Sequence, residues 1–138
     1  MKSINVPIHE LSDFFDGAIK LKRFDKQEDY SKARVMEAHR DNYYVFIILE
    51  NGLVPMDVDF TEMELKDSDI IYIRPGQVHK ADYSNPVRGW FLGIDPSVIN
   101  TVYKHVFEEV IVDIPILQLK GTEIFERICE ILRTLYII

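Results

Sequence analysis

The sequence has little cysteine and no long apolar run. Cys129 is its only cysteine, so an internal disulfide is impossible and nothing indicates an oxidising compartment. The longest apolar run, Tyr43 to Leu49, has the length of a strand, whereas a transmembrane helix needs about 20 residues. The N-terminal residues also lack the features of a signal peptide. We therefore expect a cytoplasmic protein without a membrane partner, in which Cys129 is a buried, inert thiol.

Basic residues are fewer than acidic ones, 16 against 23, which gives a net charge of -7. An acidic domain repels the phosphate backbone, so this chain by itself is a poor candidate for binding nucleic acid. The sequence has no phosphate-binding glycine loop, no Ser-His-Asp spacing and no zinc-finger cysteines. Its 138 residues, 47% of them hydrophobic, fit one domain with a substantial core.

Short strand-like segments recur at a spacing of roughly ten residues. They are Ala18–Phe24, Tyr43–Glu50, Val54–Leu65, Asp69–Ile73, Val78–Tyr83 and Val87–Ile94. Asn51-Gly52 is a strong hairpin signal. In Val54–Leu65, Met56, Val58 and Phe60 alternate with Asp57 and Asp59, which we interpret as a solvent-facing edge rather than as catalytic carboxylates. The pattern predicts a mostly β protein, an antiparallel sandwich or barrel.

Helical patterns come only after the strands. Asp95-Pro96 is a typical helix start and predicts a helix near residues 96–107. Thr122 is the expected cap of a second helix, whose apolar face includes Ile124, Ile128, Ile131 and Leu135. The sequence stops inside this second pattern, without a capping or breaking residue. We therefore expect the chain to be the N-terminal piece of a longer protein.

The stretch Asp69–His79 combines a strand, a Pro75-Gly76 corner and a histidine at the next strand. Together with His39-Arg40-Asp41-Asn42-Tyr43-Tyr44 and the glycine that follows the next strand, it resembles the cupin fold. More narrowly, it is similar to the N-terminal effector-binding and dimerisation domain of AraC-type bacterial transcription regulators. The resemblance covers residues 33 to 138. It implies a cupin-like antiparallel jelly-roll barrel followed by helices that dimerise, with a helix-turn-helix DNA-binding domain beyond them.

The resemblance fails at part of the metal site of cupin enzymes. His39 and His79 match the first and last histidine ligands, whereas Asp41 stands in place of the second histidine and Val45 in place of the acidic ligand. Two histidines and one carboxylate could hold a divalent ion in principle. Because Val45 removes one ligand, we expect no metal, no other cofactor and no catalytic residue.

Six residues are candidates for binding an effector. They are His39, Tyr43, Tyr72, Arg74, His79 and Trp90. Histidine, tyrosine and tryptophan can line an apolar pocket with polar groups, and arginine pairs with a carboxylate or a sugar oxygen. Each also has an ordinary structural explanation: the histidines bridge strands, the aromatic residues pack in the core, and Arg74 is solvated in its turn.

The sequence thus predicts a ligand-sensing, dimerising domain and not an enzyme. Residues 1–115 would form the effector-binding barrel, and residues 116–138 would begin a dimerisation region that pairs through Ile124, Ile128, Ile131 and Leu135. The effector would be a small organic molecule, such as a sugar, and DNA would be bound only by a domain absent from this chain. Two alternatives stay open. One is a metal-dependent cupin isomerase or dioxygenase, which needs His39, Asp41 and His79 to converge, and the other is a free-standing sugar-binding cupin.

Overall fold

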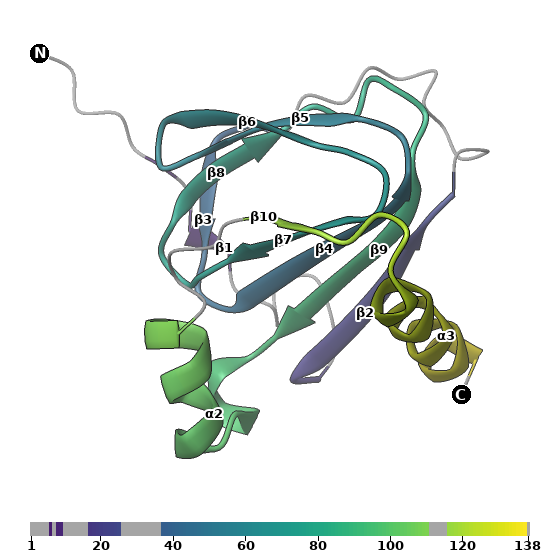
Figure 1. The fold of residues 1–138 in the computed structure, drawn as a ribbon. Coiled ribbons are helices and arrows are strands. Elements are labelled where there is room, and N and C mark those ends of the chain that lie inside the picture. Colours follow the sequence, from purple (N-terminus) through teal and green to yellow (C-terminus); the bar gives the residue numbers. More distant parts are fainter. Residues whose placement is uncertain (1–5, 7, 10–16, 26–36, 111–115, 138) are drawn as a thin grey trace, which may run out of the picture.

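The computed structural model describes residues 6, 8–9, 17–25, 37–110 and 116–137, which form two five-stranded sheets packed face to face (Figure 1). The first sheet has the order β1 (Ile8–His9), β3 (His39–Asp41), β8 (Val78–Ala81), β5 (Val54–Val58) and β6 (Thr61–Leu65). The second has the order β10 (Ile116–Gln118), β7 (Asp69–Ile73), β4 (Tyr44–Asn51), β9 (Arg88–Ile94) and β2 (Ile19–Phe24). Neighbours are antiparallel except β1 and β3. The prediction of a mostly β, antiparallel barrel is confirmed.

Strand β4 is apolar on both faces because both faces are covered. Val45, Ile47 and Leu49 point between the sheets, while Phe46 and Ile48 point outward, as the alternation of a strand requires. We call the buried residues between the sheets the inner cluster; they are Tyr43, Val45, Ile47, Leu49, Val54, Met56, Val58, Leu65, Ile71, Ile73, Ala81 and Val87. This cluster is the apolar core between the two sheets.

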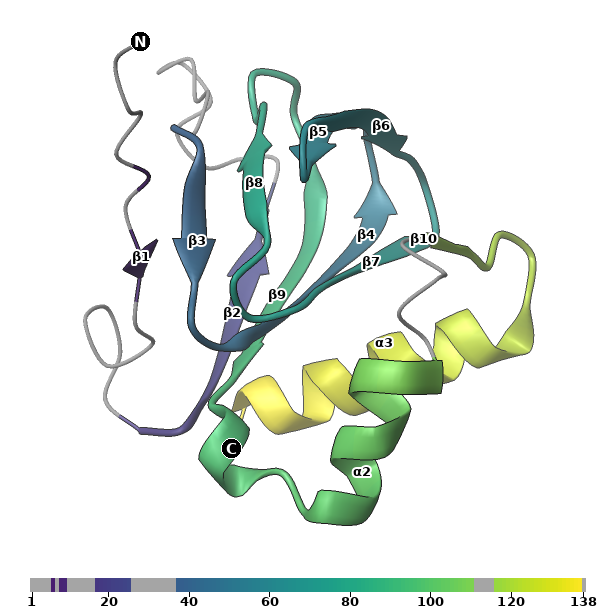
Figure 2. The same ribbon diagram turned by 90° about the vertical axis from the view of Figure 1, so that its left-hand side faces the viewer.

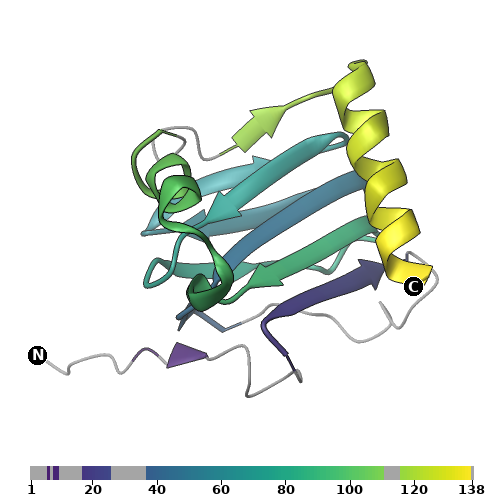
Figure 3. The same cartoon turned by 90° about the horizontal axis from the view of Figure 1, so that it is seen from below.

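Helix α3 (Glu123–Ile137) covers the outward face of the second sheet and crosses its strands at one end (Figure 3). Its buried residues join those of the sheet in what we call the outer cluster: Ile48, Ile70, Trp90, Phe125, Cys129 and Leu132. The helix begins after Thr122, whose Oγ1 accepts a hydrogen bond of 3.3 Å from the backbone N–H of Phe125. The predicted cap at Thr122 is therefore confirmed.

The helix expected near residues 96–107 is broken. Asp95 caps a single turn, η1 (Pro96–Val98), by accepting from Ser97 N at 2.8 Å. Asn100 then caps a new start, α2 (Thr101–His105), which continues as the π-helical turn η2 (Val106–Val110). The Asn100 side chain accepts from Val102 N, so it competes with continuation of the first turn. These turns lie beneath the second sheet, near the end opposite α3 (Figures 2 and 3).

The structure corrects two expectations about turns. Asn51-Gly52 does turn the chain, with Gly52 at φ +123°, but β4 and β5 do not pair. This turn carries the chain from the second sheet to the first. Conversely, Val54–Leu65 is not one strand, because a two-residue turn at Asp59-Phe60 divides it into β5 and β6. Phe60 consequently lies at the turn, 84% exposed, rather than on the apolar face.

Strand β10 belongs to the barrel although it follows the boundary expected after residue 115. Leu117 is paired with Ile70 of β7, so residues 116–118 extend the second sheet before α3 begins. Residues 111–115 lie outside the described residues. No helix in the described ranges is long and apolar enough to span a bilayer.

Candidate functional site

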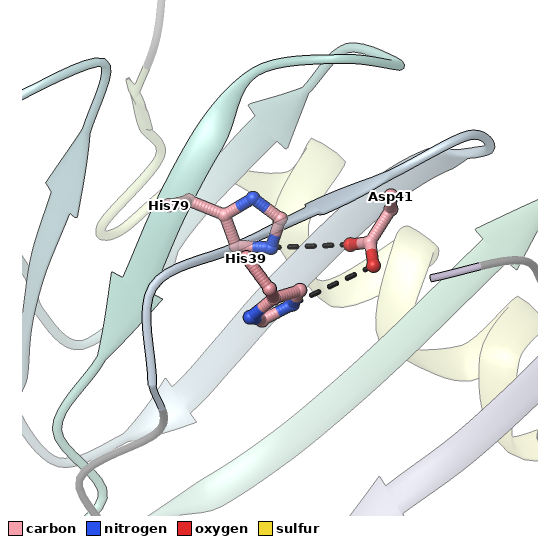
Figure 4. Close-up of side chains that lie close together, drawn as sticks. All are labelled: His39, Asp41 and His79. Carbon is pink, nitrogen blue, oxygen red and sulfur yellow. Dashed lines mark ion pairs between the residues drawn. The ribbon is translucent and has the colours of Figure 1, made fainter. Parts of the chain in front are cut away.

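Three polar side chains, His39, Asp41 and His79, meet inside the barrel at the first sheet (Figure 4). His39 and Asp41 are two apart on β3, so they share a face of the strand. His79 on β8 is the direct partner of His39 in the antiparallel register, and their ring centroids are 4.3 Å apart. All three are buried, in an interior otherwise composed mainly of apolar residues. We call them the His-Asp-His cluster.

Each imidazole of the cluster lies between two hydrogen-bond acceptors. Nδ1 of His39 is 2.9 Å from the carbonyl oxygen of Glu37, and Nδ1 of His79 is 3.1 Å from that of Gln77. Nε2 of His39 is 3.5 Å from Asp41 Oδ1, and Nε2 of His79 is 3.1 Å from Asp41 Oδ2. A neutral ring has only one N–H, so one of its nitrogens would direct a lone pair at an acceptor. At His39 this arrangement favours either double protonation or a cation at Nε2.

The electrostatics of the cluster favour charged side chains despite burial. Burial raises the pKa of Asp41, but hydrogen bonds and charge interactions with His39 and His79 outweigh it and lower that pKa to about 2. Burial lowers the pKa of His39, but Asp41 and the Glu37 carbonyl outweigh it and raise the pKa above 6.5. Asp41 is thus a buried carboxylate that stays ionised because two imidazoles face it.

The turn beside the cluster has the predicted Pro-Gly geometry. Pro75 and Gly76 occupy its two central positions, Gly76 at φ +88°, and Gln77 N donates to Arg74 O at 3.2 Å. A positive φ at the second central position is typical of a type II turn and favours glycine. Gly76 N also donates to the Asp41 carbonyl at 2.8 Å. The turn is therefore attached directly to the strand that carries Asp41.

The structure brings only part of the predicted effector-binding set together. His39 and His79 are in contact, Tyr43 lies in the inner cluster, and Arg74 is half-buried in the turn that precedes His79. Tyr72 and Trp90 do not lie with them. Because Ile71 and Ile73 point inward, Tyr72 points outward, where it packs on Phe46 at 5.1 Å between ring centroids. A single pocket inside the barrel therefore excludes Tyr72 and Trp90.

Trp90 lies beneath α3, in the outer cluster. Its Nε1 donates to Glu50 at 2.9 Å, its ring meets that of Tyr136 edge-on at 5.5 Å, and the Arg23 guanidinium lies 4.6 Å above it. Cys129 packs in the same cluster, and burial, followed by the nearby Glu50, raises the pKa of its thiol to about 12. The prediction of a buried thiol at Cys129 is confirmed, and the raised pKa keeps it in the unreactive thiol form.

Two depressions on the surface lie away from the cluster. One, of about 520 Å³, is lined by Arg23, Trp90, Glu130, Arg133, Thr134, Tyr136 and Ile137. The other, of about 530 Å³, is lined by Pro55, Met56, Asp57, Glu62, Met63, Glu64, Lys80, Ala81 and Asp82. None of the three cluster residues lines either depression. A ligand that reached the cluster would therefore bind within the barrel.

One flank of α3 carries the four residues expected to mediate pairing. Ile124, Ile131 and Leu135 are 62%, 58% and 55% exposed, whereas Ile128 is half-buried against the outer cluster. The residues that anchor the helix, Phe125, Cys129 and Leu132, lie on a different face. After α3 has packed on the sheet, one apolar side of the helix therefore remains exposed to solvent.

Three polar residues in or beside the cluster were absent from the predicted effector-binding set, although Asp41 was named with His39 and His79 as a possible metal-binding set. Asp41 contacts both histidines, Gln77 supplies the carbonyl next to His79, and Asp59 bonds the Gln77 side chain. The His39-x-Asp41 spacing signalled that His39 and Asp41 share a face of a strand. No local signal connects Asp59 with Gln77, because their contact depends on how β5, β6 and β8 are arranged.

Comparison with known proteins agrees with this architecture. A family model described as "AraC-like ligand binding domain" matches residues 24–135. No curated protein matches the sequence significantly. A conserved protein of unknown function from Streptococcus pyogenes is 11% identical with a TM-score of 0.49, covering 70% of this chain and 91% of its own. An RmlC-like cupin from Shewanella frigidimarina is 18% identical with a TM-score of 0.42, covering 57% and 66%. A cupin from Bacteroides fragilis is 15% identical with a TM-score of 0.42, covering 72% and 86%.

Proposed function

Because the chain belongs to the family of AraC-like ligand-binding domains, we propose that it is the ligand-sensing part of a bacterial AraC-type transcription regulator and not an enzyme. The observation that supports this role most strongly is the His-Asp-His cluster, a buried polar group in a barrel whose inner cluster is apolar. Small-molecule sites commonly combine apolar walls with a few convergent polar groups. Such a regulator would act in the cytoplasm.

The chemistry of the cluster suggests which ligands it would take. An ionised Asp41 accepts hydrogen bonds, and an imidazole N–H of His39 or His79 donates them. A hydroxyl group both donates and accepts, so neighbouring hydroxyls of a sugar or a related metabolite match these partners. Tyr43 adds an aromatic wall on the same side of the second sheet, and Arg74 would pair with a ligand carboxylate or a sugar oxygen from the adjoining turn.

Thermal-shift screening of the purified chain against a library of sugars and metabolites tests this proposal. A ligand that binds only the folded state adds about 2.7 kcal/mol of stability at a hundredfold excess over its Kd, so the melting temperature should rise. The rise should vanish in His39→Ala and persist in His105→Ala, since His105 is exposed on α2. A ligand whose effect is the same in both variants would place binding elsewhere.

We further propose that two copies pair through the exposed flank of α3 and that DNA is bound by a domain absent from this chain. The flank presents three large aliphatic side chains to solvent, at positions that lie on one side of a helix. Apolar surface of this kind is typical of an interface. Ligand binding inside the barrel would then alter how the two DNA-binding domains are spaced, since α3 packs directly on the second sheet.

The second candidate is a metal-holding cupin, and the geometry of the cluster favours it specifically. One ligand atom from each residue lies within 4.8 Å of the other two, and the two Asp41 oxygens lie 3.5 Å from His39 Nε2 (Oδ1) and 3.1 Å from His79 Nε2 (Oδ2). Bonds of about 2.1 Å separate neighbouring ligands by about 3.0 Å in an octahedron and about 3.4 Å in a tetrahedron. The carbonyls at both Nδ1 atoms are the usual outer partners of metal-binding histidines. His39, Asp41 and His79 therefore fit a divalent ion, which would supply Lewis acidity at the site.

Elemental analysis of protein purified without chelators decides between these candidates. Stoichiometric zinc, iron, manganese or nickel that is lost in His79→Ala but kept in His105→Ala would support the metal-holding cupin. A metal-free protein that also takes up no Zn²⁺ or Mn²⁺ in equilibrium dialysis would exclude it. Val45, whose buried side chain lies in the inner cluster, supplies no fourth ligand, so water or substrate would complete the coordination.

A further inference from the structure

Two turns that are distant in the sequence are joined beside the His-Asp-His cluster. One is the Asp59-Phe60 turn between β5 and β6, and the other is the turn from Arg74 to Gln77 between β7 and β8. Asp59 N donates to Val78 O at 2.7 Å, and Val78 N donates to Asp59 Oδ1 at 3.1 Å. The Gln77 Nε2 amide donates to Asp59 Oδ2 at 2.8 Å. Asp59 therefore contacts the start of β8 through both its backbone and its carboxylate, and the second turn through its carboxylate.

The Gln77 side chain is held at both ends. While its Nε2 donates to Asp59, its Oε1 accepts from Arg74 N at 2.8 Å. These two bonds fix which end of the amide points to which turn. The backbone carbonyl of the same residue lies 3.1 Å from Nδ1 of His79. A chain of contacts therefore runs from Asp59 through Gln77 to the His79 ring.

The Asp59-Phe60 turn is strained, and no burial compensates for the strain. Both residues have a positive φ, +48° and +66°, although neither is glycine. For Phe60 this conformation costs roughly 1 kcal/mol or more, whereas aspartate adopts it more readily. Phe60 is almost fully exposed, so its ring gains little by packing. What the turn does achieve is to direct the Asp59 carboxylate at Val78 N and Gln77, one and two residues before His79.

We propose that Asp59 and Gln77 are positioning residues of the ligand site, which together hold the Gln77 carbonyl on Nδ1 of His79. This contact keeps Nε2 of His79 directed at Asp41 and at whatever the cluster binds. His39 has no share in this arrangement, since its Nδ1 faces the carbonyl of Glu37 on another segment. The inference adds to the proposed function the residues that orient one of its ligand-contacting groups, and its test requires no effector.

A polarity swap tests the contact between the two turns. In Gln77→Glu two carboxylates would face each other, and in Asp59→Asn two amide groups would compete for too few acceptors. In the double variant, Glu at 77 accepts from Arg74 N and from the new Asn amide, while the Asn oxygen still accepts from Val78 N. Asn also tolerates the positive φ at position 59. The double variant therefore restores every bond and reverses the polarity only of the one between positions 59 and 77.

The readout is the exchange of the imidazole Nδ1–H protons with water, measured by NMR on the ¹⁵N-labelled chain. We expect each single variant to accelerate exchange at His79 about tenfold, to leave His39 unchanged, and to be rescued in the double variant. His39 is an internal control, because general destabilisation would accelerate both signals. Unchanged exchange at His79 in the single variants, equal acceleration at His39, or failure of the double variant to restore His79 would each overturn the proposal. None of these results depends on whether an effector is found.

Discussion

The two faces of the second sheet are both apolar, but they are completed differently. The inner face packs on the first sheet. Among the described residues there, the buried carboxylate that both histidines contact is that of Asp41, within the His-Asp-His cluster. The outer face packs on α3 and also contacts η2 through Tyr44, whose hydroxyl donates to Glu108. Near α3, Glu50 of β4 and Arg133 of the helix form a partly exposed ion pair. A buried polar site therefore lies on the inner side of the second sheet, and an exposed apolar flank of α3 lies on its outer side.

This difference separates the two activities that the domain would need. A buried polar cluster has little use for a protein partner, but it can exchange its hydrogen bonds with those of a small ligand. An exposed apolar flank offers few directional contacts to a small ligand, but it suits another protein surface. Ligand binding is therefore expected inside the barrel and self-association outside it, with the second sheet as the element that both share.

The largest expected effect is on the clusters that hold the two faces. Leu49→Ala in the inner cluster and Trp90→Ala in the outer cluster should each lower the free energy of unfolding by about 3 to 5 kcal/mol, because both side chains are completely buried. Urea titration followed by circular dichroism measures both. Val102→Ala on α2, an exposed control outside the proposed interface, should change it by less than about 0.5 kcal/mol. A loss confined to one face would show that only one of the clusters supports the fold.

An intermediate effect is expected at Asp41 and depends on pH. Its pKa falls from 3.8 unfolded to about 2 folded, so it contributes about 2 kcal/mol above pH 4, and this is lost as the pH falls toward 2. The raised pKa of His39 contributes stability that is present below pH 6.5 and lost as the pH rises through the folded value. Unfolding measured between these limits should show maximal stability in mild acid.

The Asp41→Asn variant is the test of that profile. It should be less stable than the wild type by about 2 kcal/mol near pH 5, and its stability should vary less with pH on both sides. Asp57→Asn, which removes a partly exposed partner of Lys80, should keep the wild-type profile. An Asp41→Asn profile that ran parallel to the wild type would contradict the assigned electrostatics of the cluster.

A smaller loss is expected at the start of α3. Thr122→Ala removes the Oγ1 that accepts from Phe125 N and donates to Leu119 O, so it should cost about 1 kcal/mol. The restoring variant is Thr122→Ser, which keeps the hydroxyl. Urea midpoints of the two variants measure the difference. If alanine and serine behaved alike, the helix would owe its position to the outer cluster alone.

Substitutions on the exposed flank of α3 should affect the folded monomer least. They should, however, greatly change the mass of the assembly in solution. Ile131→Asp with Leu135→Asp should convert a dimer to a monomer in analytical ultracentrifugation, since the charges would be buried in the interface. Thr134→Asp places the same charge at an exposed position outside the set Ile124, Ile128, Ile131 and Leu135, and should leave the mass unchanged. An unaltered mass in the double variant would sink the pairing proposal.

The sequence predicted those elements in which the apolar residues follow one regular pattern from end to end. Strand β7 and helix α3 each follow a clear pattern, and Thr122 and Asp95 cap as expected. The division of Val54–Leu65 escaped prediction because Asp59-Phe60 contains neither glycine nor proline. The break at Asn100 escaped because its side chain competes with the helix in a way that apolar spacing does not report.

The candidate site was only partly predicted, and the reason for the failure is similar. Alternation shows that a strand has two faces, but where both are apolar it does not say which one is inside. Tyr72 and Trp90 were therefore grouped with residues from which the second sheet separates them. The pairing of His39 with His79 depends on the register of β3 against β8, a contact between segments about 40 residues apart. Sequence similarity, not spacing, suggested that pairing.

The most direct test compares the two faces with one ligand. Isothermal titration of the effector identified by screening should show binding to His79→Ala at least tenfold weaker than to the wild type, a loss of about 1.4 kcal/mol for one good hydrogen bond. Tyr72→Phe, which keeps the aromatic ring on the outward face, should bind like the wild type. Wild-type affinity in His79→Ala together with weakened binding in Tyr72→Phe would contradict the account, because the ligand would then bind outside the barrel.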